Sequence, residues 1–428
     1  MANYWFFSVV TLGACFAAVA PARAASFCPG GAPGSFHGSS KYGDVVLASD
    51  HWSPGVHEVI SDGHDGAYIC GDFHTVDGVV ANNIAHWDGS SWSALIDSSG
   101  GNGLTVPPLN FGCEEMRIAQ DGNLYVGGGF IEAGGVAAQG VAMWDGVDWH
   151  ALPLGGLDGV VRGLGLVAGH IELTGHFLRH PGGPPLSTPS YIAFDPISYT
   201  WAYPPQLPGL NEGFAIKEWA ATGVTFVGGN FAAAFGHGMS ANLTHSPWSP
   251  SPFYPADTAG LVLDIEPAVE GTIDSLFFAG SFTNTFGYGP FYSPGNDTRI
   301  GKLQVTGLPV PAGVADGTVF DLERDPDSSW PVVVAAVGGF NTVSGTTSRG
   351  IAWFGTLGAT SGWWSLGSGL AGSVAIGEAS AFVVDEGGFE DEGGYRHQTC
   401  FMVGGRFSAI DGIPAGNIGD YCCPLPRP

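Results

Sequence analysis

Short apolar runs that end in glycine recur along the whole chain, and polar residues separate them. The clearest are AYICGDF over residues 67–73, NLYVGGGF over 123–130 and CFMVGGRF over 400–407. Each run is too short for a typical globular helix and shows no clean alternation of apolar and polar positions, which indicates a strand covered on both faces. We therefore expect short buried strands at these places.

The motif glycine, any residue, phenylalanine, four residues, glycine occurs seven times without exception. Because the chain of 428 residues contains 70 glycines, one copy would mean little, but seven copies in register indicate an internal repeat. The seven phenylalanines of the motif are Phe73, Phe130, Phe177, Phe231, Phe282, Phe340 and Phe407.

Two later aromatic residues complete the repeat in its best copies. They stand in IAHWDGSSW over 84–92 and in VAMWDGVDW over 141–149, whereas the fourth and fifth units are degenerate. Each unit then predicts about four short strands. Since glycine lacks a Cβ and the aromatic residues can bury large apolar surfaces, we interpret the motif as a packing device between sheets and not as catalytic machinery.

Four strands in a unit of roughly 50 residues are typical of a β-propeller blade, and a linear solenoid is the competing architecture. We predict an all-β fold, a seven-bladed β-propeller of four-stranded antiparallel blades, closed by an N-terminal strand that completes the last blade. The last unit stops after Tyr421 without a fourth strand, and the segment around Trp52 resembles the missing piece. We expect a tail over 25–40, one propeller domain over 41–428, and pairing of the Trp52 segment with the strand of Tyr421.

The apolar run, the glycines and the two later aromatic residues resemble the repeats of kelch and galactose-oxidase propellers. The pattern GGxF…G…IAxWDGxxW is most similar to the repeats of fungal cortical cell-polarity marker proteins and related bacterial secreted propellers. This resemblance spans nearly all of the chain after its first residues, and it implies the propeller fold. It implies little about activity, since such propellers serve adhesion, scaffolding, ligand binding and occasionally catalysis.

The first 24 residues predict a secretory signal peptide. An apolar stretch there is followed by Ala22-Arg23-Ala24, a small-residue cleavage pattern, although a basic n-region is missing. A lipoprotein processing site at Cys15 and a membrane anchor are the alternatives, and no other transmembrane segment is predicted. We therefore expect a secreted or cell-surface protein.

An even number of cysteines would remain after cleavage, which in an exported chain suggests disulfides. These six are Cys28, Cys70, Cys113, Cys400, Cys422 and Cys423. Cys400 and the pair Cys422–Cys423 lie on neighbouring expected strands of the last unit, so we predict that Cys400 bonds to one of the pair. Cys28 could take the other member, and Cys70 and Cys113 lie at comparable ends of the first two units.

The charge of the chain is strongly negative, with 13 basic and 39 acidic residues and a net charge of −26. Such a surface repels nucleic acid and anionic membranes, so neither is an expected partner. A hydrophobic fraction of 44% with only 12% charged residues predicts a large packed core. An extracellular glycan or protein is the expected partner.

Two acidic clusters suggest calcium as a hypothesis. DLERDPDSSW over 321–330 and DEGGFEDEGG over 385–394 fall where the loop between the first two strands of a unit is expected. Carboxylates are calcium ligands, but neither cluster has the spacing of an EF-hand, and solvated charge is the simpler interpretation. We predict no other cofactor and no defined metal site.

Catalytic motifs are not evident, since HExxH and phosphate-binding loops are absent and the histidines are scattered. If the repeats superpose, the free position of the glycine-x-phenylalanine motif forms a ring near one end of the fold. Its polar members could bind a small polar ligand or a glycan. These candidate residues are Asp72, His176, Asn230, Ser281 and Arg406.

The function that we predict is a secreted, non-enzymatic binding or surface-interaction propeller. The alternative is a secreted carbohydrate-active enzyme, either a hydrolase or a copper oxidase like galactose oxidase. A hydrolase uses a pair of carboxylates, and the candidate ring supplies only Asp72, which counts against it. No local motif calls for copper.

Overall fold

The computed structural model describes residues 35–423, apart from positions 52, 65 and 208 and several short segments. These segments are 187–188, 205–206, 221–222, 232–238, 244–249, 252–260, 271–272, 283–298, 305–309, 325–331, 358–359, 373–380, 387–389, 392–393 and 396–397. The expected signal peptide and Cys28 lie outside the described residues.

Nearly every regular element in this part of the chain is a strand, and the described residues form seven antiparallel sheets of four strands each. Sheet 1 contains β3 (Val56–Ser61), β4 (Ala67–Gly71), β7 (Ile84–Trp87) and β8 (Trp92–Ala94), and sheet 2 contains β10 (Cys113–Ile118), β11 (Leu124–Gly128), β14 (Val141–Trp144) and β15 (Trp149–Ala151). Sheet 3 contains β16 (Val160–Val167), β17 (His170–His176), β18 (Tyr191–Asp195) and β19 (Thr200–Ala202), and sheet 4 contains β20 (Leu210–Trp219), β21 (Val224–Phe231), β22 (Met239–Leu243) and β23 (Pro250–Ser251). Sheet 5 contains β24 (Val262–Glu270), β25 (Ile273–Gly280), β26 (Ile300–Gln304) and β27 (Val310–Gly313), and sheet 6 contains β28 (Val319–Arg324), β29 (Val332–Gly338), β32 (Ile351–Leu357) and β33 (Thr360–Ser365). Sheet 7 contains β35 (Ala381–Glu386), β38 (Gln398–Gly404), β41 (Ile418–Cys423) and β1 (Ser35–His37).

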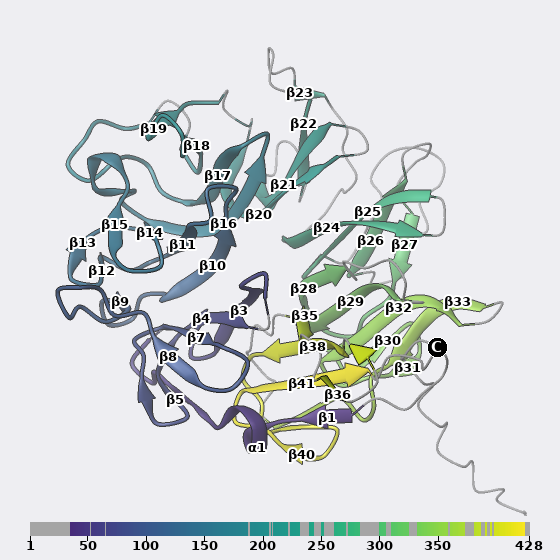
Figure 1. Ribbon diagram of the computed structural model, residues 1–428. Helices are drawn as coiled ribbons and strands as arrows, with labels where there is room; N and C mark the ends of the chain where they lie inside the picture. Colours follow the sequence, from purple (N-terminus) through teal and green to yellow (C-terminus); the bar gives the residue numbers. More distant parts are fainter. Residues whose placement is uncertain are drawn as a thin grey trace, which may run out of the picture.

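The sheets follow one another around the molecule, with their first strands toward its centre (Figure 1). Each first strand contacts the first strand of the next sheet, from β3 to β35. Strand β35 also contacts β3, so the contacts return to sheet 1. The first strands therefore surround a common central region.

The N-terminal strand β1 supplies the fourth strand of sheet 7. Phe36 pairs with Tyr421, and the centroids of their rings lie 4.6 Å apart. The prediction that the segment around Trp52 pairs with this strand was wrong, because β41 lies between β38 and β1; position 52 itself lies outside the described residues. Directly after β1, helix α1 (Ser39–Tyr42) places Lys41 and Tyr42 on the buried carboxylate of Asp420.

The packing role of the repeated motif is confirmed. All seven motif phenylalanines are buried. At six of the seven units a Cβ on the first glycine of the motif would collide with a backbone oxygen near the start of the sheet's first strand, as at Gly128 with Gly112. In four of the described units the second glycine lies in a two-residue hairpin, as at Asp77 and Gly78, which both have the positive φ that a type I′ turn requires.

A repeated hydrogen bond joins consecutive sheets. A tryptophan of the outermost strand donates its indole N–H to a backbone carbonyl at the outer end of the preceding sheet. The four described cases are Trp92 to Tyr42 (2.7 Å), Trp149 to Leu95 (3.1 Å), Trp201 to Pro153 (2.8 Å) and Trp363 to Ala312 (2.6 Å). The aromatic positions of the repeat therefore bond the sheets to one another as well as filling the space between them.

Two disulfides are present among the described residues. Cys400 bonds to Cys422 within sheet 7, as predicted, and Cys70 bonds to Cys113, which joins sheets 1 and 2. In the described part of the chain, no helix is long and apolar enough to span a bilayer.

The acidic clusters are placed differently from the prediction. Asp321 and Glu323 lie inside β28, and Asp385 and Glu386 end β35, whereas a loop was expected. Polar residues are interspersed among the apolar ones in these first strands. The predicted strands therefore ended before these carboxylates, whereas the strands in the structure include them. Two of these carboxylates, Asp321 and Glu323, therefore stand on an innermost strand.

Candidate functional site

Six of the first strands carry a β-bulge at the same place, directly after the residue that pairs with the first motif glycine. A bulge adds one unpaired residue and redirects its side chain. We call these six the bulge residues: His57, Glu114, Arg162, Phe214, Leu263 and Phe320. The first three are polar and the last three apolar, so this end of the central region has two chemically different halves.

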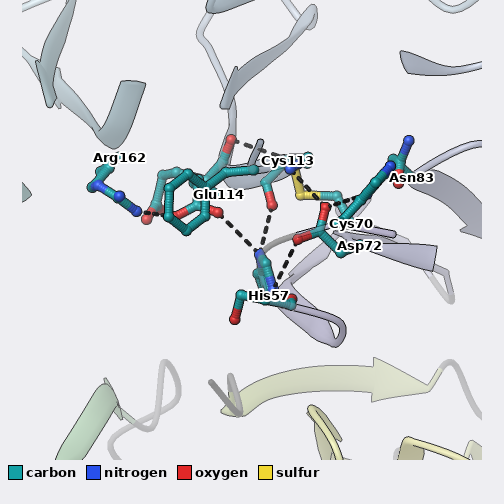
Figure 2. Close-up of polar contacts among 12 residues, drawn as sticks. His57, Cys70, Asp72, Asn83, Cys113, Glu114 and Arg162 are labelled. Carbon is teal, nitrogen blue, oxygen red and sulfur yellow. Dashed lines mark hydrogen bonds and ion pairs between the residues drawn. A yellow bond between two sulfur atoms is a disulfide. The ribbon is translucent and has the colours of Figure 1, made fainter. Parts of the chain in front are cut away.

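A chain of ion pairs runs through the polar half and links four consecutive sheets. His57 Nδ1 lies 3.2 Å from Glu114 Oε1, and Arg162 Nη1 lies 2.6 Å from Glu114 Oε2. Arg162 Nε donates to Glu212 Oε1 of β20 at 2.6 Å. Figure 2 shows His57 between Asp72 and Glu114, with Arg162 on the far side of Glu114.

The Arg162 guanidinium also joins the polar half to the apolar one. Its central carbon lies 4.1 Å from the centroid of the Phe111 ring and 5.5 Å from that of Phe214. Such cation–π contacts hold the guanidinium in place. Burial by itself would raise the pKa of Glu114, but Arg162 and His57 outweigh it and hold this pKa below its usual range.

Asp72, a predicted ligand-binding residue, is fully buried beneath this site. Its Oδ1 accepts hydrogen bonds from the backbone N–H of Gly112 and from His51 Nδ1, both at 2.7 Å. His57 Nε2 lies 3.9 Å from its other oxygen and 2.6 Å from the Ser53 carbonyl. Asp72 therefore organises the loops around His57.

The other predicted site residues are more open. His176 and Asn230 are exposed at the ends of β17 and β21, and Asn230 is the direct cross-strand partner of Glu212. Ser281 is half-buried and accepts the backbone N–H of Leu261. Arg406 is exposed and lines a groove of about 470 Å³ between the N-terminal segment and sheet 7. Of these four, Asn230 adjoins the ion-pair chain directly.

Carboxylates also crowd the first strands farther along the central region. Arg117 Nη1 lies 3.0 Å from Glu58 Oε1 and 2.5 Å from Glu115 Oε1. Burial, with Glu115 nearby, raises the pKa of Glu58 to about 8. Burial likewise raises the pKa of Glu115 to about 7, although Arg117 opposes it.

A cavity of about 330 Å³ lies at the ends of β16, β20 and β24, near the opposite end of the first strands. Lys217 and Glu266 form an ion pair of 3.0 Å in its wall. Burial, with Asp264 nearby, raises the pKa of Glu266 despite Lys217. The cavity wall carries equal numbers of acidic and basic side chains, so its charge favours no ligand class.

Potential metal ligands converge in the described residues at His37, Asp420 and Cys422. Cys422 is bonded to Cys400, and Asp420 already accepts hydrogen bonds from His37, Lys41 and Tyr42. This donor set is used within the fold and does not suit a metal ion. The calcium hypothesis for the acidic loops concerns segments that are largely outside the described residues.

The bulge residues were missed in sequence because their residue types differ from unit to unit. They also lie 13 to 18 residues before the first glycine of the motif, because the hairpin between the first two strands differs in length from unit to unit. Aligning the units on that glycine would have placed His57 and Glu114 in one column but Arg162 in the next. A bulge has no compositional signature of its own, so the sequence did not reveal these residues as a set.

No protein-family model matches the chain, and no curated protein matches it significantly. Among solved structures, the chain is similar to the extracellular domain of the putative hybrid two-component system BT4673 from B. thetaiotaomicron, with 13% identity, a TM-score of 0.43, and coverage of 91% of this chain and 40% of that one. It is also similar to YjhT (13%, TM-score 0.38, 75% and 98% covered) and to the Hadza microbial sialidase Hz136 (10%, TM-score 0.37, 92% and 68% covered). At these TM-scores the likenesses carry no argument about fold or activity.

Proposed function

We propose that the protein is an exported, closed seven-bladed β-propeller that binds a hydroxyl-rich ligand, a glycan, at the bulge residues. Seven four-stranded sheets with contacts that return from β35 to β3 support the closed ring. Two disulfides support an oxidising compartment, because cytosolic thiols are normally kept reduced. The expected signal peptide agrees with this location.

The ligand proposal rests on Arg162, where carboxylates and aromatic rings lie side by side. On one side stand the carboxylates of Glu114 and Glu212, and on the other the half-buried rings of Phe111 and Phe214. A sugar ring has an apolar face that packs on aromatic rings and hydroxyl groups that donate to carboxylates. A site with both surfaces side by side matches that ligand class.

Binding is favoured over hydrolysis at this site. A glycosidase needs one carboxylic acid that stays protonated, with a raised pKa, beside a second carboxylate. Glu114 has a lowered pKa because of Arg162, so it is a poor proton donor. Glu58 and Glu115 have raised pKa values and make the hydrolase the second candidate, although both are ion-paired with Arg117.

A glycan array followed by calorimetric titration of the disulfide-intact protein tests the proposal. Phe214→Ala should weaken binding about tenfold or more, because stacking on an aromatic ring is lost. Tyr203→Ala, which removes a half-exposed aromatic residue after the outermost strand of sheet 3, is the matched control and should bind normally. Normal binding by Phe214→Ala would contradict the site, and turnover of the bound glycan would favour the hydrolase.

The outer candidates and calcium remain part of the proposal. His176, Ser281 and Arg406 would extend the contact with a longer glycan or with an extracellular protein. Metal analysis of the purified protein, before and after chelation, tests calcium in the acidic loops.

A further inference from the structure

We infer that Glu212 and Asn230 make this site selective for a sugar that carries a primary ammonium group, and that they disfavour acidic sugars. The inference rests on the proposed function and specifies the ligand class of the same site. It comes from the exposure, pairing and charge of these two residues.

Glu212 and Asn230 form the most open polar part of the ion-pair chain. They are directly opposite in the register of β20 and β21, so their side chains project from the same face of sheet 4. The Glu212 side chain is 25% exposed, compared with 14% for Arg162 and 6% for Glu114. A ligand at this end of the molecule therefore meets Glu212 and Asn230 first.

Arg162 is not available to attract an anion. Its Nη1 and Nε atoms are bound to Glu114 and Glu212, and two phenylalanine rings pack on it. Three carboxylates, those of Asp72, Glu114 and Glu212, stand in this part of the molecule with Arg162, His51 and His57, within a chain of net charge −26. The potential at the site thus favours a cationic group and opposes a carboxylate.

The available acceptors suit an ammonium group. An ammonium carries three donors and no acceptor, and the Glu212 carboxylate and the Asn230 amide oxygen both accept hydrogen bonds. Charge-assisted bonds to a carboxylate are stronger than neutral ones. Phe214 lies two residues after Glu212 on β20, so a sugar ring packed on Phe214 brings a substituent within reach of Glu212.

The test compares three hexoses that differ in one substituent: glucose, glucosamine and glucuronate. The wild-type protein should bind glucosamine about fivefold more tightly than glucose, and glucuronate more weakly than both. Glu212→Gln should abolish the preference for glucosamine and change glucose binding little, because the amide keeps the shape and removes the charge.

Glu218→Gln is the matched control, since it removes one charge from the other end of the same strand, and it should keep the wild-type order of affinities. Glucuronate binding as tight as that of glucosamine, or an unchanged preference in Glu212→Gln, would overturn this inference and leave the proposed function standing. Failure of the wild-type protein to bind any sugar would overturn both.

Discussion

The indole N–H of Trp149 donates a hydrogen bond to the carbonyl oxygen of Leu95, which lies 54 positions earlier in the chain. The bond runs from the outermost strand of sheet 2 to the end of sheet 1. The same bond at Trp92, Trp201 and Trp363 gives a physical cause for the recurrence of a second aromatic residue in these units. The outer strands, which are farthest from the centre, are held to the preceding sheet by these bonds.

Trp149→Phe should lower the free energy of unfolding by about 1 kcal/mol more than Trp87→Phe does. Both changes remove similar apolar volume from a buried position, but the indole N–H of Trp87 has no hydrogen-bond partner in the structure. A hydrogen bond contributes about 1 kcal/mol net to stability. Urea denaturation of the two variants measures the difference, and equal losses would show that these indole bonds do not stabilise the fold.

Gly128→Ala should destabilise the protein by about 1–3 kcal/mol, because the new methyl group would collide with the backbone of Gly112 at the start of β10. Gly362→Ala is the control, since a Cβ at that position in β33 meets no neighbour. Thermal unfolding should separate the two variants clearly. A tolerated alanine at position 128 would disprove the close approach as the reason for the first motif glycine.

The two disulfides should differ in their effect on the candidate site. Removing Cys70–Cys113 by double alanine substitution should weaken ligand binding, because Glu114 follows Cys113 directly and His57 Nδ1 contacts the Cys113 carbonyl. Removing Cys400–Cys422 should leave affinity unchanged, since this bond lies within sheet 7. The Cys400–Cys422 disulfide also closes a shorter loop than Cys70–Cys113, 22 against 43 residues. Removing Cys400–Cys422 should therefore reduce stability by about 0.6 kcal/mol less, because less chain entropy is gained by the unfolded state. Parallel calorimetry and denaturation of both variants check this, and equal affinities would be evidence against a positioning role for Cys70–Cys113.

Stability should fall as the pH rises from about 5 to about 8. The pKa of Glu58 is raised from 4.5 to about 8 in the folded protein, and that of Glu115 to about 7, so the folded state holds more protons than the unfolded state in this window. The stabilisation from the protonated Glu58 and Glu115 side chains is complete below their pKa in the unfolded chain. It is lost as the pH rises through their pKa in the folded protein. Glu58→Gln should flatten this dependence in denaturant titrations across the window; a wild-type slope in that variant would assign the effect to other groups.

The sequence was most informative at positions where every repeat unit has the same packing requirement. The motif phenylalanines and glycines were predictable because each sheet needs the same buried ring and the same close approach of backbone. His57, Glu114 and Arg162 were not predictable as a group, since they interact only after three sheets have been brought together. Asp72 was expected in a ligand-binding ring near one end of the fold, but it is buried by segments that contain His51, Gly55 and Gly112, whose path no local pattern indicates. Strand β1 was missed because three residues are too few to show a pattern.

Sheet 7 combines the N-terminal strand β1 with three strands from the other end of the described chain, and this limits the order in which the protein can fold. Among the described strands, its outermost strand β1 is synthesised first and the neighbouring β41 last. His37 and Asp420, which share a hydrogen bond of 2.7 Å, are separated by 383 positions. Contacts of such long sequence separation form late, because the intervening chain must first be ordered. Sheets 1 to 6 can assemble as the chain emerges, whereas residues 35–37 lack their native partner until β41 has been synthesised. We therefore expect the pairing of β1 with β41 to be a late step of folding.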